Sequence, residues 1–225
     1  MVTIRKHLVS STIADKVTYG KGNSRKKICI HETDNTRPTA TANAHGRLQA
    51  NGNSREASWH YTVDDKEAVQ SFDHSIRCWA AGSTKGNNEA IHIEICVNSD
   101  GDYKKAVQNT AELVAMVLKE ENLTINDVVQ HNYYSGKNCP RNMRNGTVIP
   151  WSSFILMIKS NLEPKKEVED MSQEFLNITG RAEAKAMIKK GVAEKLFSDK
   201  HEDIDSYDDV KLLSYALAYL NRKLK

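Results

Sequence analysis

Apolar and polar positions alternate along several short stretches of this chain, and the clearest alternation covers residues 90–97. Its odd-numbered positions are all isoleucine or valine, so one face of a strand here is wholly apolar. The other face carries His92, Glu94 and Cys96. A carboxylate inside a sheet is costly unless it is paired or lines a cavity. The pattern therefore predicts either a central strand with a functional glutamate or an edge strand with one face in water.

Three further stretches have the composition of strands. Residues 26–33 form a short apolar run between polar residues, and His31 lies near its end. Residues 57–65 and 68–72 flank a polar turn, which predicts a β-hairpin. Residues 78–88 are rich in small and polar residues, so we expect a loop there.

Helical spacing of apolar residues is strongest between Tyr103 and Glu121. A second helix is expected over residues 38–50, where His45 would lie at the surface, because Pro38 can open a helix and Asn51-Gly52 can end it. A third runs over residues 150–162. Strands that alternate with helices indicate an α/β domain, with a sheet covered by helices.

The composition changes near residue 163. Residues 164–172 are rich in proline and charge, which is typical of a linker. Beyond them, helical spacing returns at residues 180–197 and 206–225. We therefore expect a main domain over residues 1–163 and a small all-α region over residues 173–225. Roughly fifty residues bury little apolar surface, so this region packs on the main domain, self-associates or is a marginal binding module.

The charge and the cysteine content exclude several classes of protein. Residues 1–163 hold 20 Lys+Arg and 17 Asp+Glu, and residues 164–225 hold 12 of each, for a net charge of +3. This scattered excess is not the basic stripe of a nucleic-acid-binding protein, although it is compatible with an anionic polymer. Four cysteines are too few for a disulfide scaffold and indicate a reducing compartment. No stretch has the apolar length of a secretory signal or of a membrane helix.

Residues 130–140 place an imidazole and a thiol, His131 and Cys139, eight positions apart across a Ser-Gly turn. Together with His31 they would supply three protein ligands to a zinc ion and leave a fourth position for water, as in catalytic zinc sites. A single spacing of this kind is weak support, and a histidine near an apolar run is more often a polar residue satisfied by hydrogen bonds. On spacing alone, both interpretations stay open.

Four segments taken together carry a resemblance to a known family, and they are residues 28–33, 58–65, 91–96 and 131–140. In order and spacing they resemble the zinc-dependent N-acetylmuramoyl-L-alanine amidases of the type-2 amidase and peptidoglycan-recognition family. The similarity is greatest to endolysins of phages and prophages of Gram-positive bacteria. It covers roughly residues 2–160 and implies a central mixed β-sheet flanked by helices.

The resemblance also implies a reaction and a set of roles. His31, His131 and Cys139 would be the ligands of Zn²⁺, Glu94 the general acid and base, and Lys137 the group that stabilises the oxyanion. The bond cleaved would be the amide between N-acetylmuramic acid and the L-alanine of the stem peptide in bacterial cell-wall peptidoglycan.

The chain departs from the family pattern at two positions. His92 stands where relatives often carry glycine, and Ala80 follows Trp79 where many carry histidine. Trp59, His60 and Trp79 are expected to contact the substrate. For His60, the alternative of a histidine satisfied within the sheet stays open.

Two rival functions fit the sequence less well. A non-catalytic peptidoglycan-recognition module is disfavoured, because such relatives lose the cysteine ligand and Cys139 is present. A zinc deaminase is disfavoured, because His92-Ile93-Glu94 is not followed by P-C-x-x-C. By the resemblance, we expect synthesis in the bacterial host cytoplasm without a signal peptide and release to the wall through a holin. We expect the C-terminal helices to bind the wall or to self-associate, with no nucleic acid and no membrane insertion.

Overall fold

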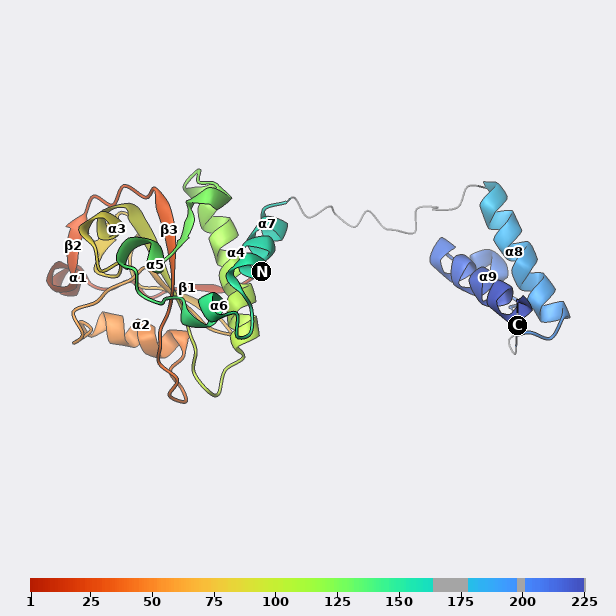
Figure 1. The fold of residues 1–225 in the computed structure, drawn as a ribbon, viewed down its shortest axis with the longest axis horizontal. Coiled ribbons are helices and arrows are strands. Elements are labelled where there is room, and N and C mark those ends of the chain that lie inside the picture. Colours follow the sequence, from red (N-terminus) through yellow and green to blue (C-terminus); the bar gives the residue numbers. More distant parts are fainter. Residues whose placement is uncertain (164–177, 198–200, 225) are drawn as a thin grey trace. The chain divides into compact units, whose positions relative to one another are not determined.

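The computed structural model describes residues 1–163, 178–197 and 201–224. The chain divides into two compact units, Met1–Pro164 and Lys165–Lys225 (Figure 1). The predicted linker at residues 164–172 lies outside the described residues. None of the described helices has the length and apolarity that crossing a membrane requires.

Two sheets form the frame of the larger unit. Its described strands are β1 Ile4–Lys6, β2 Thr18–Lys21, β3 Lys27–Glu32, β4 Tyr61–Val63, β5 Ala68–Gln70, β6 Ile76–Cys78, β7 Ala90–Ile95 and β8 Val128–Gln130. Six of them form a mixed sheet in the order β1-β5-β4-β7-β3-β8, and β2 pairs with β6 in a small antiparallel sheet. Within the large sheet, only β4 and β5 pair antiparallel. They are the predicted hairpin, so that prediction is confirmed.

Helices cover the large sheet, as expected for a chain in which strands and helices alternate (Figure 1). The described helices of this unit are α1 Ser11–Val17, α2 Ala42–Ala50, α3 Thr84–Glu89, α4 Tyr103–Glu120, the 3-10 helix η1 Ile125–Asp127, α5 Asn132–Ser135, α6 Arg141–Asn145 and α7 Trp151–Leu162. Helix α4 packs on the sheet and on α7, and α2 contacts β4 and β5. The predicted central mixed sheet flanked by helices is confirmed.

Strand β7 lies between β4 and β3, so the edge-strand alternative for residues 90–97 is wrong. Ile91, Ile93 and Ile95 belong to the main apolar core, together with buried residues of α4 and α7. On the other face, β3 and β7 pair in register, with Cys29 opposite His92 and His31 opposite Glu94. Because side chains two residues apart share a face, these four polar groups form one patch inside the protein.

Two elements differ from the sequence-based expectation. Helix α2 begins at Ala42 and not at Pro38, since Thr39 has a φ of 64° and the Thr41 side chain caps the helix by accepting the Ala44 N–H. The expected loop over residues 78–88 contains most of α3, whose N-cap is Ser83. In both places the cap residue, and not the average composition, determines where the helix starts.

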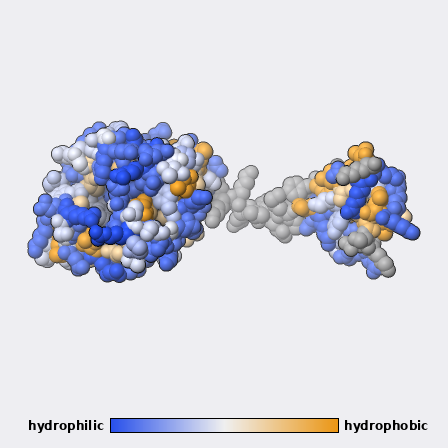
Figure 2. Space-filling view, turned by 60° about the horizontal axis from the view of Figure 1, so that its bottom comes forward, coloured by the Kyte–Doolittle hydropathy of each residue, from blue (hydrophilic) through white to orange (hydrophobic). Residues whose placement is uncertain are grey.

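The smaller unit contains two described α-helices and a 3-10 helix, with its own apolar core. These elements are α8 Ile178–Ala193, η2 Ile204–Ser206 and α9 Asp209–Lys223. Its core residues are Ala184, Ile188, Ile204, Tyr207, Leu212 and Ala216. Figure 2 shows hydrophobic surface on this unit. Helix α9 exposes the apolar side chains of Val210, Leu213, Leu217 and Leu220, and Leu224 at its C-cap is also exposed.

Candidate metal centre

Two histidines meet where neighbouring parallel strands end. His31 is near the end of β3, and His131 directly follows β8, which pairs with β3. The His131 backbone N–H continues this pairing by donating to the Ile30 carbonyl (3.1 Å). The Nδ1 atoms of the two rings consequently lie 2.9 Å apart. The carboxyl ends of strands in an open α/β sheet are where ligands commonly bind.

A short helix and a turn bring Cys139 to the two histidines. The C-cap of helix α5 is Gly136, whose φ of 72° is left-handed and therefore suits glycine. The Asn132 side chain donates to the Lys137 carbonyl (2.9 Å), and its backbone N–H donates to the Cys139 carbonyl (3.0 Å). The candidate ligand atoms of His31, His131 and Cys139 all lie within 4.8 Å of one another. The structure thus brings the three sequence-predicted ligands together.

The chemistry of these three groups fits a zinc ion. Burial lowers the pKa of His31 well below its ordinary value and also lowers that of His131, so both rings are neutral and can offer a lone pair. Burial raises the pKa of the Cys139 thiol to about 12. A bound cation would stabilise its thiolate, with release of a proton. Two imidazoles and one thiolate are a donor set found in catalytic zinc sites.

Glu94 and Lys137 line the same cavity of about 220 Å³ as the three candidate ligands. Glu94 Oε1 lies 3.9 Å from His31 Nδ1. Its Oε2 is buried and has no hydrogen-bond partner among the described residues. Burial raises the pKa of this carboxyl to about 8, an effect that Lys137 partly opposes. A carboxyl with a pKa near neutrality can both accept and donate a proton, as a general acid and base must.

Of the three predicted substrate contacts, Trp59 and Trp79 line the cavity. The Trp59 indole N–H donates to Thr62 Oγ1 (2.7 Å). The buried indole N–H of Trp79 has no hydrogen-bond partner among the described residues.

His60 does not reach the cavity. Its side chain is fully buried behind the site, where Nδ1 accepts the backbone N–H of His92 (2.9 Å) and Nε2 donates to the Ile76 carbonyl (3.0 Å). Burial lowers its pKa to about 3. These contacts match the alternative interpretation, a histidine satisfied within the sheet.

Other residues that line the cavity were not anticipated from the sequence. They include His45, expected at the surface, and Arg55 from the segment after α2. His45 is buried, and its Nδ1 lies 2.9 Å from the Thr41 carbonyl. The position of both residues depends on how α2 packs, for which the sequence gives no local signal.

The chain is similar in structure and in sequence to several known proteins. The structure of the catalytic domain of XlyA is 36% identical, with a TM-score of 0.64, and the match covers 70% of this chain and 99% of that one. A mutant endolysin from Bacillus subtilis is 38% identical, with a TM-score of 0.65 and the same coverage. Among curated proteins, the N-acetylmuramoyl-L-alanine amidase CwlH of Bacillus subtilis (strain 168) is 38% identical over 170 residues, 74% of this chain.

This chain spans 65% of the length of CwlH and 42% of that of XlyA, an N-acetylmuramoyl-L-alanine amidase of the same strain. Residues 21–142, more than half of the chain, match the family Amidase_2, described as N-acetylmuramoyl-L-alanine amidase. The chain therefore belongs to the Amidase_2 family of N-acetylmuramoyl-L-alanine amidases.

Proposed function

We propose that this protein is a zinc-dependent hydrolase of bacterial peptidoglycan. It cleaves the amide bond between N-acetylmuramic acid and the L-alanine of the stem peptide. The observation that carries the proposal is one cavity lined by His31, His131, Cys139 and a buried glutamate with a raised pKa. Membership of a family of amidases and a close structural match to the catalytic domain of XlyA support the same reaction.

The residues of the cavity divide the chemistry between them. His31, His131 and Cys139 would hold a zinc ion, which would supply a Lewis acid and lower the pKa of water towards neutrality. Glu94 accepts the proton of the attacking water and returns it to the leaving amine, a role typically worth about 10²–10⁴-fold in rate. Lys137 places a positive charge in the cavity, which stabilises the negative charge that develops on the amide oxygen.

The cavity wall supplies substrate contacts. Trp59 and Trp79 offer aromatic surface beside the reacting groups, and the Trp79 indole N–H donates to a polar group of the substrate. The non-catalytic alternative is less well supported, because a recognition module needs neither a complete ligand set nor a carboxyl tuned to neutrality.

Residues 173–225 have a separate role in the proposal: they direct the enzyme to the cell wall. They contain no cysteine and only one histidine, His201, whose Nδ1 lies 2.9 Å from the Tyr207 hydroxyl. The exposed apolar side chains of α9 suit either attachment or self-association. The enzyme acts on the wall after release from the cell that makes it, through a holin.

Mass spectrometry of purified cell walls after digestion tests the reaction directly. We expect each cleavage to expose the amino group of L-alanine and to leave the lactyl carboxylate on N-acetylmuramic acid. Walls treated with the Glu94→Gln protein serve as the matched control. New reducing sugar ends, or new termini inside the stem peptide, would contradict the proposed bond.

A further inference from the structure

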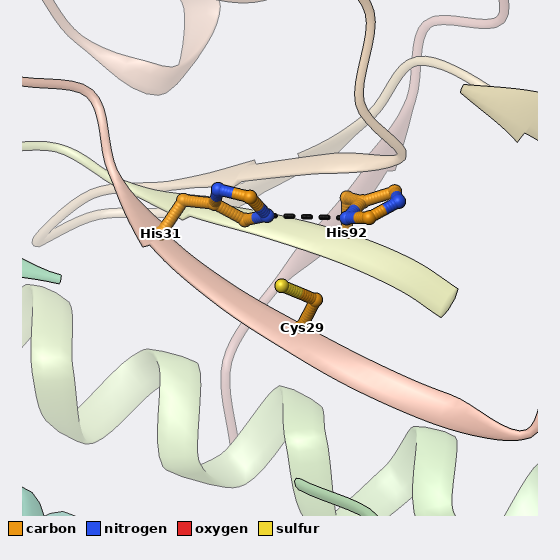
Figure 3. Close-up of side chains that lie close together, drawn as sticks. All are labelled: Cys29, His31 and His92. Atoms are coloured by element: carbon orange, nitrogen blue, oxygen red, sulfur yellow. Dashed lines mark hydrogen bonds between the residues drawn. The ribbon is translucent and has the colours of Figure 1, made fainter. Parts of the chain in front are cut away.

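Both nitrogens of His31 are engaged, and each faces a different histidine. Its Nδ1 faces His131 in the cavity, and its Nε2 lies 3.1 Å from Nδ1 of His92 (Figure 3). His31 is 1% exposed and His92 is fully buried, so bulk water does not compete for this contact. The two residues lie diagonally on one face of the paired strands β3 and β7.

The direction of this hydrogen bond determines which nitrogen of His31 can bind a metal. A neutral imidazole carries one proton, so a ring that offers Nδ1 to a cation must hold its proton on Nε2. That proton then points at Nδ1 of His92, which accepts it. If His92 donated instead, the His31 proton would sit on Nδ1 and block the metal-binding atom.

The two nitrogens of the His92 ring differ in their contacts. Nδ1 faces His31, whereas the buried Nε2 has no hydrogen-bond partner among the described residues. To accept the His31 proton at Nδ1, the neutral His92 ring must carry its own proton on Nε2. His92 then has a lone pair on Nδ1, where the His31 proton arrives.

His60 contacts both the backbone and the ring of His92. Its Nε2 donates to the Ile76 carbonyl, which leaves Nδ1 as an acceptor, and that atom accepts the His92 backbone N–H. The rings of His60 and His92 also stack, with centroids 5.8 Å apart and planes inclined by 26°. The position of His92 is therefore fixed through both its backbone and its ring.

We propose that His92 is a positioning residue that keeps His31 in the tautomer whose Nδ1 binds the metal. Metal-binding histidines usually donate their other N–H to a carboxylate, a carbonyl or water. Here a buried, neutral imidazole takes that place. The inference rests on the proposed metal centre of His31, His131 and Cys139.

A second metal site at the same place is the competing interpretation. Cys29 lies beside the pair (Figure 3), and Cys29, His31 and His92 have candidate ligand atoms within 4.8 Å of one another. Neither Cys29 nor His92 lines a described cavity, and a metal there would consume the Nε2 proton of His31. The hydrogen bond accounts for the contact without a second ion.

Zinc affinity, measured by competition with a chromophoric chelator, tests the proposal without relying on activity. His92→Ala should weaken zinc binding by roughly 10–100-fold, the usual effect of removing the hydrogen-bond partner of a metal ligand. His92→Gln should restore most of the affinity, because its amide oxygen can accept the same proton. Cys29→Ala is the matched control and should bind zinc like the wild type.

A second measurement does not depend on whether any variant folds. Nitrogen-15 spectra of the imidazoles in the zinc-loaded wild-type protein should show the His31 proton on Nε2 and the His92 proton also on Nε2. A His31 proton on Nδ1, or wild-type zinc affinity in both His92 variants, would overturn the role of His92. Weakening by Cys29→Ala as strong as by His92→Ala would favour the second metal site. A wild-type protein that binds no zinc would overturn the metal centre itself and this inference with it.

Discussion

The two faces of the β3–β7 pair are built on the same backbone and are both buried. One face forms part of the apolar core, and the other carries the polar groups of the site. One face presents isoleucines, among them Ile30 and Ile93, to the main core. The other presents His31, His92 and Glu94. Burial shifts the pKa of each of these groups in the direction that favours its neutral form. Burial by itself therefore does not identify a core. The two faces differ in the free energy of removing their side chains from water, which is favourable for an apolar group and unfavourable for a polar one.

Burial of the two faces therefore contributes to the free energy of folding with opposite signs. Burial of an isoleucine side chain contributes about 1.5–3 kcal/mol to folding. A buried polar group costs free energy unless a partner replaces its water. His31 and His92 have each other, whereas Oε2 of Glu94 has no partner among the described residues. Glu94 is thus a group whose charge the fold stabilises only in part, through Lys137.

Loss of Cys139 should have the largest effect on the polar face. Cys139→Ser replaces a thiolate ligand with a poorer one, so we expect tightly bound zinc and wall-lytic activity to be lost. The loss should exceed the roughly 10–100-fold weakening caused by removing a hydrogen-bond partner of a ligand. Elemental analysis of the purified proteins measures it, with Cys78→Ser as the control. Equal tight zinc in wild type and Cys139→Ser would rule out this ligand assignment.

Glu94→Gln should separate catalysis from the metal centre. The substitution removes the proton acceptor and keeps nearly the same shape, so turnover should fall about 10²–10⁴-fold. Zinc content and the folded structure should be unchanged. Release of soluble muropeptides from purified walls gives the rate. Near-normal turnover would remove Glu94 from the mechanism.

Ile93→Ala should show the reverse pattern on the apolar face. Ile93 is fully buried in the core, so its truncation should destabilise the fold by about 2–5 kcal/mol. The groups that do the chemistry point to the other face, so turnover per folded molecule should stay near the wild-type value. Denaturant unfolding and activity at a temperature where the variant is folded measure the two effects. A large fall in turnover with unchanged stability would contradict the division between the faces.

The cost of the buried glutamate should appear as a dependence of stability on pH in the metal-free protein. The pKa of Glu94 is about 8 when folded against 4.5 as the ordinary value. Between these values the unfolded chain releases a proton that the folded chain retains, so this group makes the protein less stable as pH rises. Relative to wild type, metal-free Glu94→Gln should therefore gain stability from about pH 4.5 to about pH 8. A constant difference over this range would show that Glu94 is ionised in the folded state.

Much of this could be predicted from the sequence, because the relevant signals are local. Alternation over residues 90–97 indicated strand β7, whereas the His131–Cys139 spacing left the ligands open and only the resemblance of four segments together implied them. Helix α3 was not expected because it contains a glycine, and the reason for that glycine is a tertiary contact. A Cβ at Gly86 would lie 2.4 Å from the Ala81 Cβ and 2.8 Å from the Tyr134 ring, so close packing requires glycine inside this helix. The sequence shows only a residue typical of loops.

The histidines behind the site could not be assigned for a similar reason. His60 is beside Trp59 in sequence, which suggested a substrate contact, but its partners come from Ile76 and the His92 backbone. Alternation along a strand tells which residues share a face. It does not tell which of them face the cavity and which lie behind it, because that depends on segments distant in sequence.

The smallest effect on catalysis should come from removal of the smaller unit. A protein that ends at residue 163 keeps both faces of the β3–β7 pair and every residue proposed for the chemistry. It should therefore cleave soluble muropeptide at close to the full rate. Binding to intact walls should weaken, because a tethered binding module raises the local concentration of substrate without changing the catalytic groups.

Pull-down with purified walls and turnover of a soluble muropeptide measure the two quantities on the same preparations. The full chain with Glu94→Gln is a suitable control, because it should bind walls like the wild type and cleave poorly. The balanced charge of residues 164–225 argues against purely electrostatic attachment, so wall binding by the full chain should depend only weakly on salt. Loss of zinc or of folding in the shortened protein would instead mean that the smaller unit is an integral part of the catalytic domain.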